Sequence, residues 1–163
     1  MRVLGIDPSL QSTGFGVIES EGNSYIPVAY GTIKPQKNLD FCHKLNKIKT
    51  ELEKIILSYT PEEVAIENPF YAQNVRTAIA LGQVRGAVLV AVAGQNCGLF
   101  EYSALEIKKA VTGYGQAGKD QVQAMVKILL QIDEAIPLDA SDALAAAICH
   151  LNSRLFQKKL EEN

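Results

Sequence analysis

The sequence predicts an α/β protein with a mixed five-stranded sheet, in which an antiparallel three-strand meander continues into parallel strands and helices flank the sheet. Three observations support this fold class. Three short segments rich in β-branched residues lie within residues 2–33 and are separated by turn residues. Two later apolar segments, 64–66 and 99–102, are too short for helices. Segments with helical periodicity precede and follow them, as in strand–helix–strand units with parallel strands.

The first strand is predicted over residues 2–6, which form a short apolar run with β-branched residues. Asp7 ends this strand, because the following Pro8 has no amide hydrogen to donate to a sheet. A carboxylate at this position can cap the turn, as aspartate often does, or it can bind a cation. This stretch alone leaves both interpretations open.

A polar turn follows, and residues 13–18 return as the second strand of a hairpin. Gly14 and Gly16 leave room in that strand for another group to approach the backbone. Residues 24–33 complete the meander as its third strand.

Two long segments show helical periodicity. Apolar residues recur at three- and four-residue steps between Leu39 and Ile56, opposite lysines that form a solvated face. The helix expected over residues 74–94 is apolar nearly all round after its first turn, which indicates burial in the core or in a subunit interface. Gly82 and Gly86 would allow another element to approach this helix closely.

Carboxylates also mark two later elements. The strand over residues 64–66 ends in Glu67, so a second strand carries a carboxylate at its carboxyl end. In the last helix, expected over residues 139–156, Asp139 and Asp142 point the same way from the first turn. Acidic residues favour helix N-termini as caps, so capping is the alternative for this pair.

A glycine-rich segment connects the remaining elements. The strand over residues 99–102 leads into a short helix over 104–111. The segment 112–119 then opens a helix over 120–131. Backbone amides at a helix start, together with Lys119, suit a phosphate group, and a plain glycine-rich connector is the alternative.

Composition limits the class of protein. With 163 residues, 47% of them hydrophobic, the chain suits one globular domain, expected over residues 1–157 with a frayed tail at 158–163. The net charge of −2 argues against a broad basic nucleic-acid surface but permits a local basic patch. Three widely spaced cysteines are typical of free thiols in a reducing cytoplasm. Because the apolar runs are short, we expect no signal peptide, no membrane span and a cytoplasmic protein.

The predicted fold gathers the carboxylates. With the first and fourth strands as parallel neighbours, Asp7 and Glu67 meet at one end of the sheet, and a helix across that end adds Asp139 and Asp142. Four carboxylates cannot all stay ionised at close range without cations. Oxygen-only ligands favour a hard metal, Mg²⁺ or Mn²⁺. Two such ions, about 3.5–4 Å apart, suit an in-line phosphoryl displacement, and this is the architecture of ribonuclease H-like nucleases.

Five motifs make the resemblance specific, and they cover nearly the whole chain: GIDPSLQSTGFGVIE, AIENPF, LGQVRGAVL, IKKAVTGYGQAGKDQVQAMV and DASDALAAAICH. On these motifs the chain resembles the RuvC family, bacterial crossover junction endodeoxyribonucleases that resolve four-way (Holliday) DNA junctions in recombination and repair. Together the motifs are highly specific, although each alone is weak.

The resemblance implies roles for individual residues. The four carboxylates would be catalytic and would bind Mg²⁺, in two ions per active site, with Mn²⁺ as a substitute. Phe70 would stack on junction bases, and Lys108 and Lys119 would contact DNA. The family further implies a homodimer with one active site per subunit, and a RuvA–RuvB-type branch-migration complex of a junction-binding protein and a ring ATPase as its partner.

Three positions depart from the family pattern. Ser9 stands where glycine is usual, Gln11 stands where basic residues are common, and Pro69 stiffens the backbone before Phe70. These departures concern the loops and the strength of substrate contacts rather than the carboxylate set.

Three other interpretations fit parts of the sequence. A sugar kinase or actin-like ATPase also starts with a strand, an aspartate and a glycine-rich hairpin, but that fold needs two such halves and a far longer chain. A resolvase of the YqgF type shares the opening motif, but the segments around Glu67 and Asp139 fit the RuvC family better. A non-catalytic junction-binding protein would not need all four carboxylates.

Overall fold

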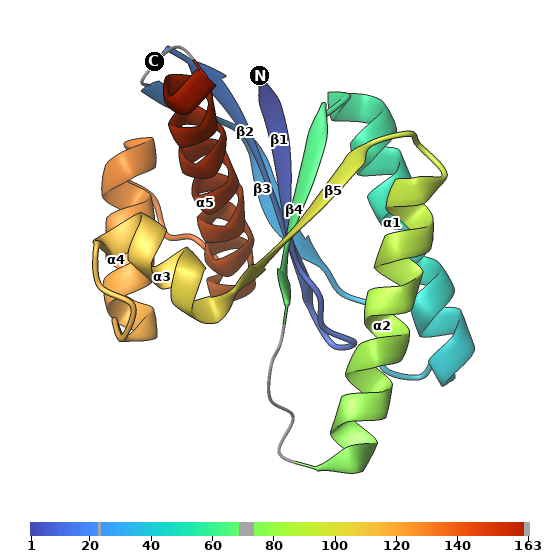
Figure 1. Ribbon diagram of the computed structural model, residues 1–163. Helices are drawn as coiled ribbons and strands as arrows, with labels where there is room; N and C mark the ends of the chain where they lie inside the picture. The colour runs from blue at the N-terminus through green and yellow to red at the C-terminus, as the bar shows by residue number, and fades with distance from the viewer. Residues whose placement is uncertain (23, 69–73, 162–163) are drawn as a thin grey trace.

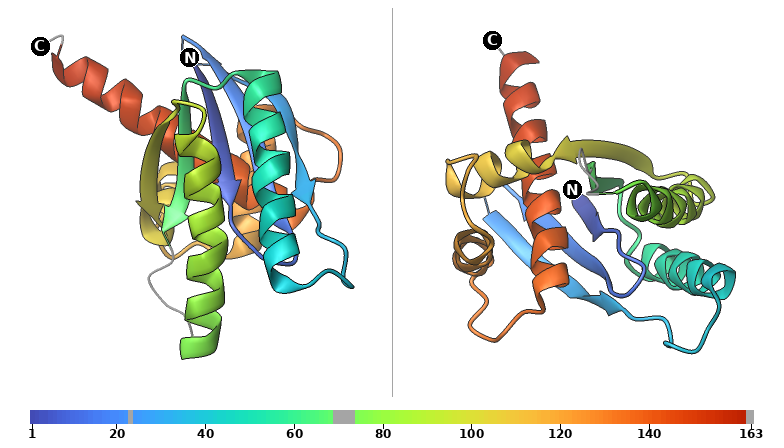
Figure 2. Two further views of the ribbon diagram at one scale, coloured as in Figure 1. Left: turned by 90° about the vertical axis from the view of Figure 1, so that its right-hand side faces the viewer. Right: turned by 90° about the horizontal axis from the view of Figure 1, so that it is seen from below.

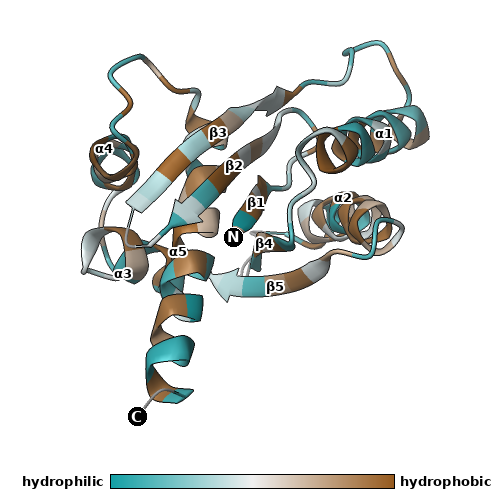
Figure 3. Ribbon diagram, turned by 90° about the horizontal axis from the view of Figure 1, so that it is seen from above, coloured by the Kyte–Doolittle hydropathy of each residue, from teal (hydrophilic) through white to brown (hydrophobic). Residues whose placement is uncertain are grey.

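The computed structural model describes residues 1–22, 24–68 and 74–161, and it confirms the mixed five-stranded sheet flanked by helices (Figure 1). The strands are β1 (Arg2–Asp7), β2 (Thr13–Glu21), β3 (Ser24–Ile33), β4 (Glu63–Asn68) and β5 (Gly98–Ser103). The helices are α1 (Phe41–Tyr59), α2 (Val75–Ala93), α3 (Ala104–Thr112), α4 (Lys119–Leu130) and α5 (Leu138–Glu161). Helices α1 and α2 cover one face of the sheet, and α3, α4 and α5 cover the other (Figure 3).

The sheet order is β3-β2-β1-β4-β5, with the first three strands antiparallel and β4 parallel to both β1 and β5. This confirms the meander and the parallel pairing of the first and fourth strands. In the β1–β4 register Ile6 lies opposite Ile66. Asp7 and Glu67, the next residues along, therefore lie at the same end of two neighbouring strands.

The period of two along each strand decides which face these carboxylates take. Ile6 and Ile66 belong to the buried cluster beneath α1 and α2. Ala65 belongs to the cluster on the other face, beneath α3, α4 and α5. Because Asp7 and Glu67 directly follow Ile6 and Ile66, the alternation turns both carboxylates toward the α5 side of the sheet.

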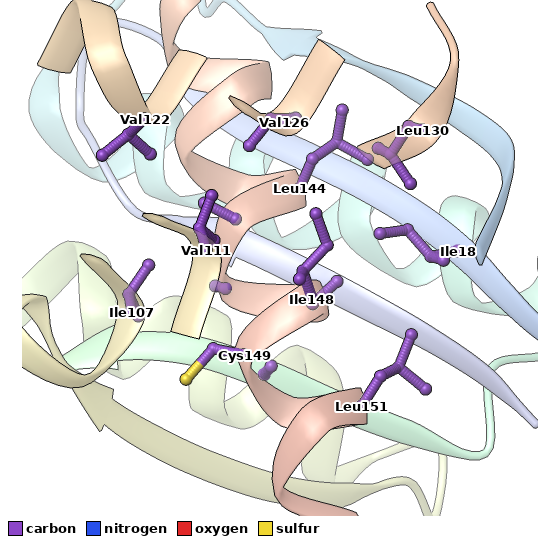
Figure 4. Packing of buried hydrophobic residues seen from close by; sticks show 14 of the residues in the cluster. Ile18, Ile107, Val111, Val122, Val126, Leu130, Leu144, Ile148, Cys149 and Leu151 are labelled. Carbon is purple, nitrogen blue, oxygen red and sulfur yellow. The ribbon is translucent and has the colours of Figure 1, made fainter. Parts of the chain in front are cut away.

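Helix α5 is the central element of that second layer. Residues 143–151 are all buried, because other elements cover this part of the helix on every side. Its burial explains why this segment is apolar nearly all round. Figure 4 shows Leu144 and Ile148 of α5 in one cluster with Val111 of α3 and Val126 of α4. The packing fixes where the first turn of α5, and hence its acidic pair, lies over the sheet.

Glycines let α5 lie directly on the strands. A Cβ added to Gly5 would lie 1.8 Å from the carbonyl oxygen of Ala143, and one added to Gly14 would lie 1.9 Å from that of Asp139. Gly16 also faces α5, where an added Cβ would lie 2.5 Å from Cδ2 of the Leu144 side chain. Real Cβ atoms do not approach other atoms so closely, so only glycine permits this packing. The space predicted beside the hairpin is therefore filled by α5.

A polar network ties the middle of α5 to β4 and β5. The Nδ1 atom of the fully buried His150 lies 2.7 Å from the Tyr102 hydroxyl, and its Nε2 atom hydrogen-bonds to Glu63. Arg154 forms an ion pair with Glu63 and lies 4.5 Å from the centre of the Phe100 ring. Burial lowers the pKa of His150, and Glu63 opposes that effect. The network satisfies polar groups inside the core and so holds α5 in register.

Helix α2 is less buried than the sequence suggested. Its buried residues are Val84, Val88, Ala91 and Val92, which form a single face toward α1 and the sheet. Of the two alternatives, burial in the core is therefore wrong, because α2 packs by one face only within this chain, and burial in a subunit interface stays a prediction. By length and composition α2 could also cross a membrane. This is weak evidence for a membrane span, because α2 packs against α1 in this fold.

Helix α5 continues past its expected end at Phe156 to Glu161, so residues 158–161 are helical. Figure 2 shows this last part of the helix extending away from the sheet. Lys158 and Lys159 lie in the final turn, where positive side chains interact favourably with the helix dipole. Residues 162 and 163 lie outside the described part of the chain.

Candidate active site

The acidic pair of α5 lies beside the strand ends. Asp139 follows the first residue of α5, and its carbonyl oxygen packs on Gly14, which is the β2 partner of Asp7. Asp142 lies three residues further along, on the same side of the helix. In the described part of the chain neither carboxylate accepts a hydrogen bond from a helix-start amide, so the structure gives no support to the capping alternative.

Three of the four carboxylates line one pocket of about 290 Å³ at this end of the sheet. They are Asp7 from β1, Glu67 from β4 and Asp142 from α5. The pocket walls also contain the following residues: Pro8, Leu81, Arg85, Ala104, Ile107, Lys108, Lys119, Val122 and Ala145. Asp139 is not one of the lining residues, but its charge raises the pKa of both Asp7 and Asp142.

The nearby lysines do not fully offset the burial and mutual repulsion of these carboxylates. Burial, followed in order of size by the charges of Asp142, Glu67 and Asp139, raises the pKa of Asp7 to about 7. Burial also raises the pKa of Glu67 and of Asp142, and Lys119 partly offsets the effect at all three. A carboxyl group with a pKa of about 7 is only partly ionised near neutral pH unless a cation binds beside it.

Lys119 supplies part of the positive charge beside these carboxylates. Its Nζ atom lies 3.3 Å from Oδ2 of Asp142, which raises the pKa of the lysine. The Lys119 side chain is 68% exposed, so it lines the pocket at its mouth. Lys108 also lines the pocket, and its charge lowers the pKa of Glu67 and of Asp142. The structure therefore gathers both lysines that the resemblance assigned to DNA contacts.

The donor set fits hard divalent cations. Carboxylate oxygens are the ligands that Mg²⁺ and Mn²⁺ prefer, and their mutual repulsion would be relieved by such ions. Among the described residues, only Asp40, Cys42 and His43 place three ligand atoms within 4.8 Å of one another. Asp40 is the N-cap of α1 and accepts a hydrogen bond from the amide of His43, so helix capping accounts for that exposed group.

Two further observations concern residues without a confirmed role. Phe70 and Pro69 lie outside the described residues, so the expected stacking position of Phe70 stays a prediction. Arg85 lies in the LGQVRGAVL motif, and the sequence alone indicates no function for it. It lines the pocket and forms an ion pair with Glu101, while its Nη1 atom is buried without a hydrogen-bond partner in the described part of the chain. No signal in the sequence distinguishes this arginine from an ordinary surface residue of a helix.

The fold and the site define a class of protein, the nucleases that hydrolyse phosphodiester bonds at a carboxylate cluster on a mixed α/β sheet. A family model described as "Crossover junction endodeoxyribonuclease RuvC" matches residues 3–150. The chain therefore belongs to the RuvC family of crossover junction endodeoxyribonucleases.

Individual relatives agree with this assignment. A crossover junction endodeoxyribonuclease RuvC from Geotalea uraniireducens is 48% identical over 161 residues, which cover 99% of this chain and 94% of the relative. The protein of that name from Geobacter sulfurreducens is 46% identical over 160 residues, with 98% of each chain covered. The solved structure of Thermus thermophilus RuvC in complex with Holliday junction substrate matches with a TM-score of 0.91 at 28% identity, covering 96% of each chain.

Proposed function

We propose that this chain resolves four-way (Holliday) DNA junctions by metal-dependent hydrolysis of phosphodiester bonds in two symmetric strands, during recombination and repair. The observation that carries the proposal is the meeting of three partly buried carboxylates and two lysines around one pocket. The Thermus thermophilus relative was solved with a Holliday junction substrate, and its close structural likeness supports the same substrate here.

The proposed ligands are Asp7, Glu67, Asp139 and Asp142, holding two Mg²⁺ ions for which Mn²⁺ would substitute. When bound, such ions supply polarisation of the phosphate and activation of the attacking water. The protein contributes the rigid placement of these ligands: Asp7 and Glu67 come from adjacent buried strands, and α5 is held on β2 by glycine contacts. A site built on strands and a buried helix keeps its geometry when DNA arrives.

The two lysines would bind phosphate groups of the cut strand. In the free protein Lys119 compensates the charge of Asp142. When metal cations balance the charge of Asp142 instead, the ammonium group of Lys119 would be able to contact a phosphate oxygen at the mouth of the pocket. Lys108 approaches the pocket from α3, on the wall beside Glu67. From the resemblance we also propose that Phe70 stacks on the bases of the junction.

We further propose a homodimer formed through α2. Helix α2 presents a stripe of small and apolar residues away from the sheet: Val75, Ile79, Gly82, Gly86 and Val90. Val75 is 75% exposed, and Ile79 and Val90 are each 58% exposed. A Cβ added to Gly82 or Gly86 would meet nothing within 4 Å, so the stripe is open to a partner. A second copy would cover this stripe and would bring two active sites to two symmetric strands.

The resemblance also supports a RuvA–RuvB-type branch-migration complex as the cellular partner, and a cytoplasmic location. The YqgF-type resolvase and the non-catalytic junction-binding protein are the alternatives to the enzyme proposed here. An actin-like ATPase would bind nucleotide and would not cut DNA.

One experiment separates these possibilities. The protein is incubated with Mg²⁺ and either a synthetic four-way junction or a linear duplex that contains the same strands. A junction resolvase cuts the junction in two symmetric strands and leaves the duplex intact. Binding of the junction without cleavage would support the non-catalytic alternative, and cleavage of both DNAs alike would support a nuclease without junction selectivity.

A further inference from the structure

The glycine-rich loop between α3 and α4 carries an exposed aromatic residue that the proposed function does not use. Tyr114 lies in this loop, and its side chain is 60% exposed. The loop joins the helix that carries Lys108 to the helix that begins with Lys119, and both lysines line the active-site pocket. In Figure 1 the loop descends to the end of the molecule at which β1 and β4 terminate.

The backbone of Tyr114 is fixed although its ring is exposed. Its amide lies 3.2 Å from Oγ1 of Thr112, and its carbonyl oxygen accepts a hydrogen bond from the amide of Ala117 at 3.2 Å. Gly113 takes a φ of 76°, which a residue with a side chain rarely adopts. These contacts make the loop a defined turn that follows directly from α3.

The rest of the loop packs inward. A Cβ on Gly115 would lie 2.9 Å from Cδ1 of Leu105, so the loop lies against the side chain of the preceding helix. Ala117 is 2% exposed and is part of the core cluster beneath α5. The Tyr114 hydroxyl reaches only Gln116, at 3.4 Å, within the described part of the chain. The fold thus anchors both sides of the loop and leaves one aromatic ring facing solvent.

We propose that the ring of Tyr114 stacks on an unstacked base of the junction strand whose phosphate enters the pocket, and that this contact favours junctions over continuous duplex. The inference rests on the proposed function. Aromatic rings between basic side chains bind single-stranded nucleic acid, because every base has a face on which a ring can stack. Base stacking is interrupted where strands exchange in a four-way junction, whereas the interior of a linear duplex offers no free base face. Tyr114 would therefore add affinity only where the DNA is open.

The test compares Tyr114→Ala and Tyr114→Phe with the unchanged protein, in binding titrations without divalent metal so that no DNA is cut. We expect Tyr114→Ala to weaken junction binding about 5- to 140-fold, which corresponds to ~1–3 kcal/mol for one stacked base, and to leave duplex binding unchanged. Tyr114→Phe keeps the ring and should bind like the unchanged protein. Phe156→Ala is a matched control, since Phe156 is 64% exposed but lies near the C-terminal end of α5 and does not line the active-site pocket.

A second readout reports stacking directly. Junctions with the fluorescent base 2-aminopurine at successive positions beside the cut site should show quenching at one position with the unchanged protein and with Tyr114→Phe, and none there with Tyr114→Ala. If Tyr114→Ala misfolds, Tyr114→Leu tests the same point, because it keeps an apolar side chain without a ring.

Equal junction binding by Tyr114→Ala and the unchanged protein would overturn the proposal. So would a loss in Tyr114→Phe as large as that in Tyr114→Ala, since the hydroxyl and not the ring would then make the contact. Junction cleavage by the unchanged protein is measured in parallel. If it persists while Tyr114 proves dispensable, the proposed function stands and only this inference fails.

Discussion

The backbone of Gly14 lies directly against the backbone of Asp139, so that a methyl group on the glycine would come within 1.9 Å of the carbonyl oxygen of the aspartate. Gly14 is also the register partner of Asp7. One contact between β2 and α5 therefore sets the position of the acidic pair of α5 relative to the carboxylate of β1.

Gly14→Ala should push the first turn of α5 away from the sheet. Overpacking of a core typically costs about 1–3 kcal/mol. The added Cβ would clash with a backbone oxygen, which can move less easily than the end of a side chain. We expect a lower melting temperature together with a large loss of junction cleavage. Gly94→Ala is the control, because its φ of −67° suits alanine and an added Cβ would meet its nearest neighbour at 3.5 Å. Unchanged stability and activity of Gly14→Ala would contradict the close packing.

The raised pKa of Asp7 predicts that the metal-free protein becomes less stable as the pH rises. The folded carboxyl has a pKa of about 7, above the ordinary value of 3.8, so between these pH values the folded state binds more protons than the unfolded state. The stabilising contribution is complete below the ordinary value and is lost as the pH passes through about 7. A shift of this size corresponds to at most about 4 kcal/mol.

Unfolding of the unchanged protein and of Asp7→Asn, measured with a chelator at pH 5 and pH 8, checks this sign. Asp7→Asn should be the more stable protein at pH 8, and the difference should shrink at pH 5, because the neutral amide carries no charge to bury. Asp133→Asn, at an exposed carboxylate away from the pocket, should show no such trend. A constant difference between Asp7→Asn and the unchanged protein at both pH values would refute the assignment.

Lys108 and Lys119 should each neutralise one phosphate of the bound junction. Lys108→Met or Lys119→Met should weaken junction binding and reduce the slope of log affinity against log salt by about one unit. Lys109→Met is a close control, because Lys109 is exposed on α3 next to Lys108 but does not line the pocket. Titrations at several salt concentrations measure the slope, and an unchanged slope would make both lysines ordinary surface residues.

The stripe on α2 predicts that a charge placed within it prevents dimerisation. Ile79→Glu should sediment as a monomer at micromolar concentration, whereas the unchanged protein should sediment at twice the chain mass. Ile128→Glu supplies the control, since Ile128 is 68% exposed on α4, outside this stripe. If Ile79→Glu remains a dimer, the partner must bind elsewhere on the surface.

The order of elements, the meander and the neighbouring positions of Asp7 and Glu67 could be predicted from the sequence, because strand alternation and helix periodicity are local patterns. Two features could not. The exposed face of α2 depends on what covers it, and an apolar pattern does not distinguish a core from an interface. The burial that raises the pKa of Asp7 likewise depends on α5 lying against Gly14, a contact between residues far apart in the chain.

Helix capping and metal binding by Asp142 make opposite predictions for Asp142→Asn. Asparagine caps helices about as well as aspartate, so a capping role would survive the change. A ligand role would not, because the loss of one negative charge weakens the hold on divalent cations. The metal-free variant should be at least as stable as the unchanged protein, because one source of carboxylate repulsion is gone.

Cleavage of a synthetic four-way junction by Asp142→Asn shows whether the carboxylates around this pocket hold the metal ions that cut junctions. We predict a folded dimer that binds the junction with near-normal affinity but cuts it at least ~100-fold more slowly in Mg²⁺, since several kcal/mol of transition-state stabilisation depend on the ions. The same loss should follow Asp7→Asn, Glu67→Gln and Asp139→Asn. Near-normal magnesium-dependent cleavage by Asp142→Asn would contradict the four-carboxylate site.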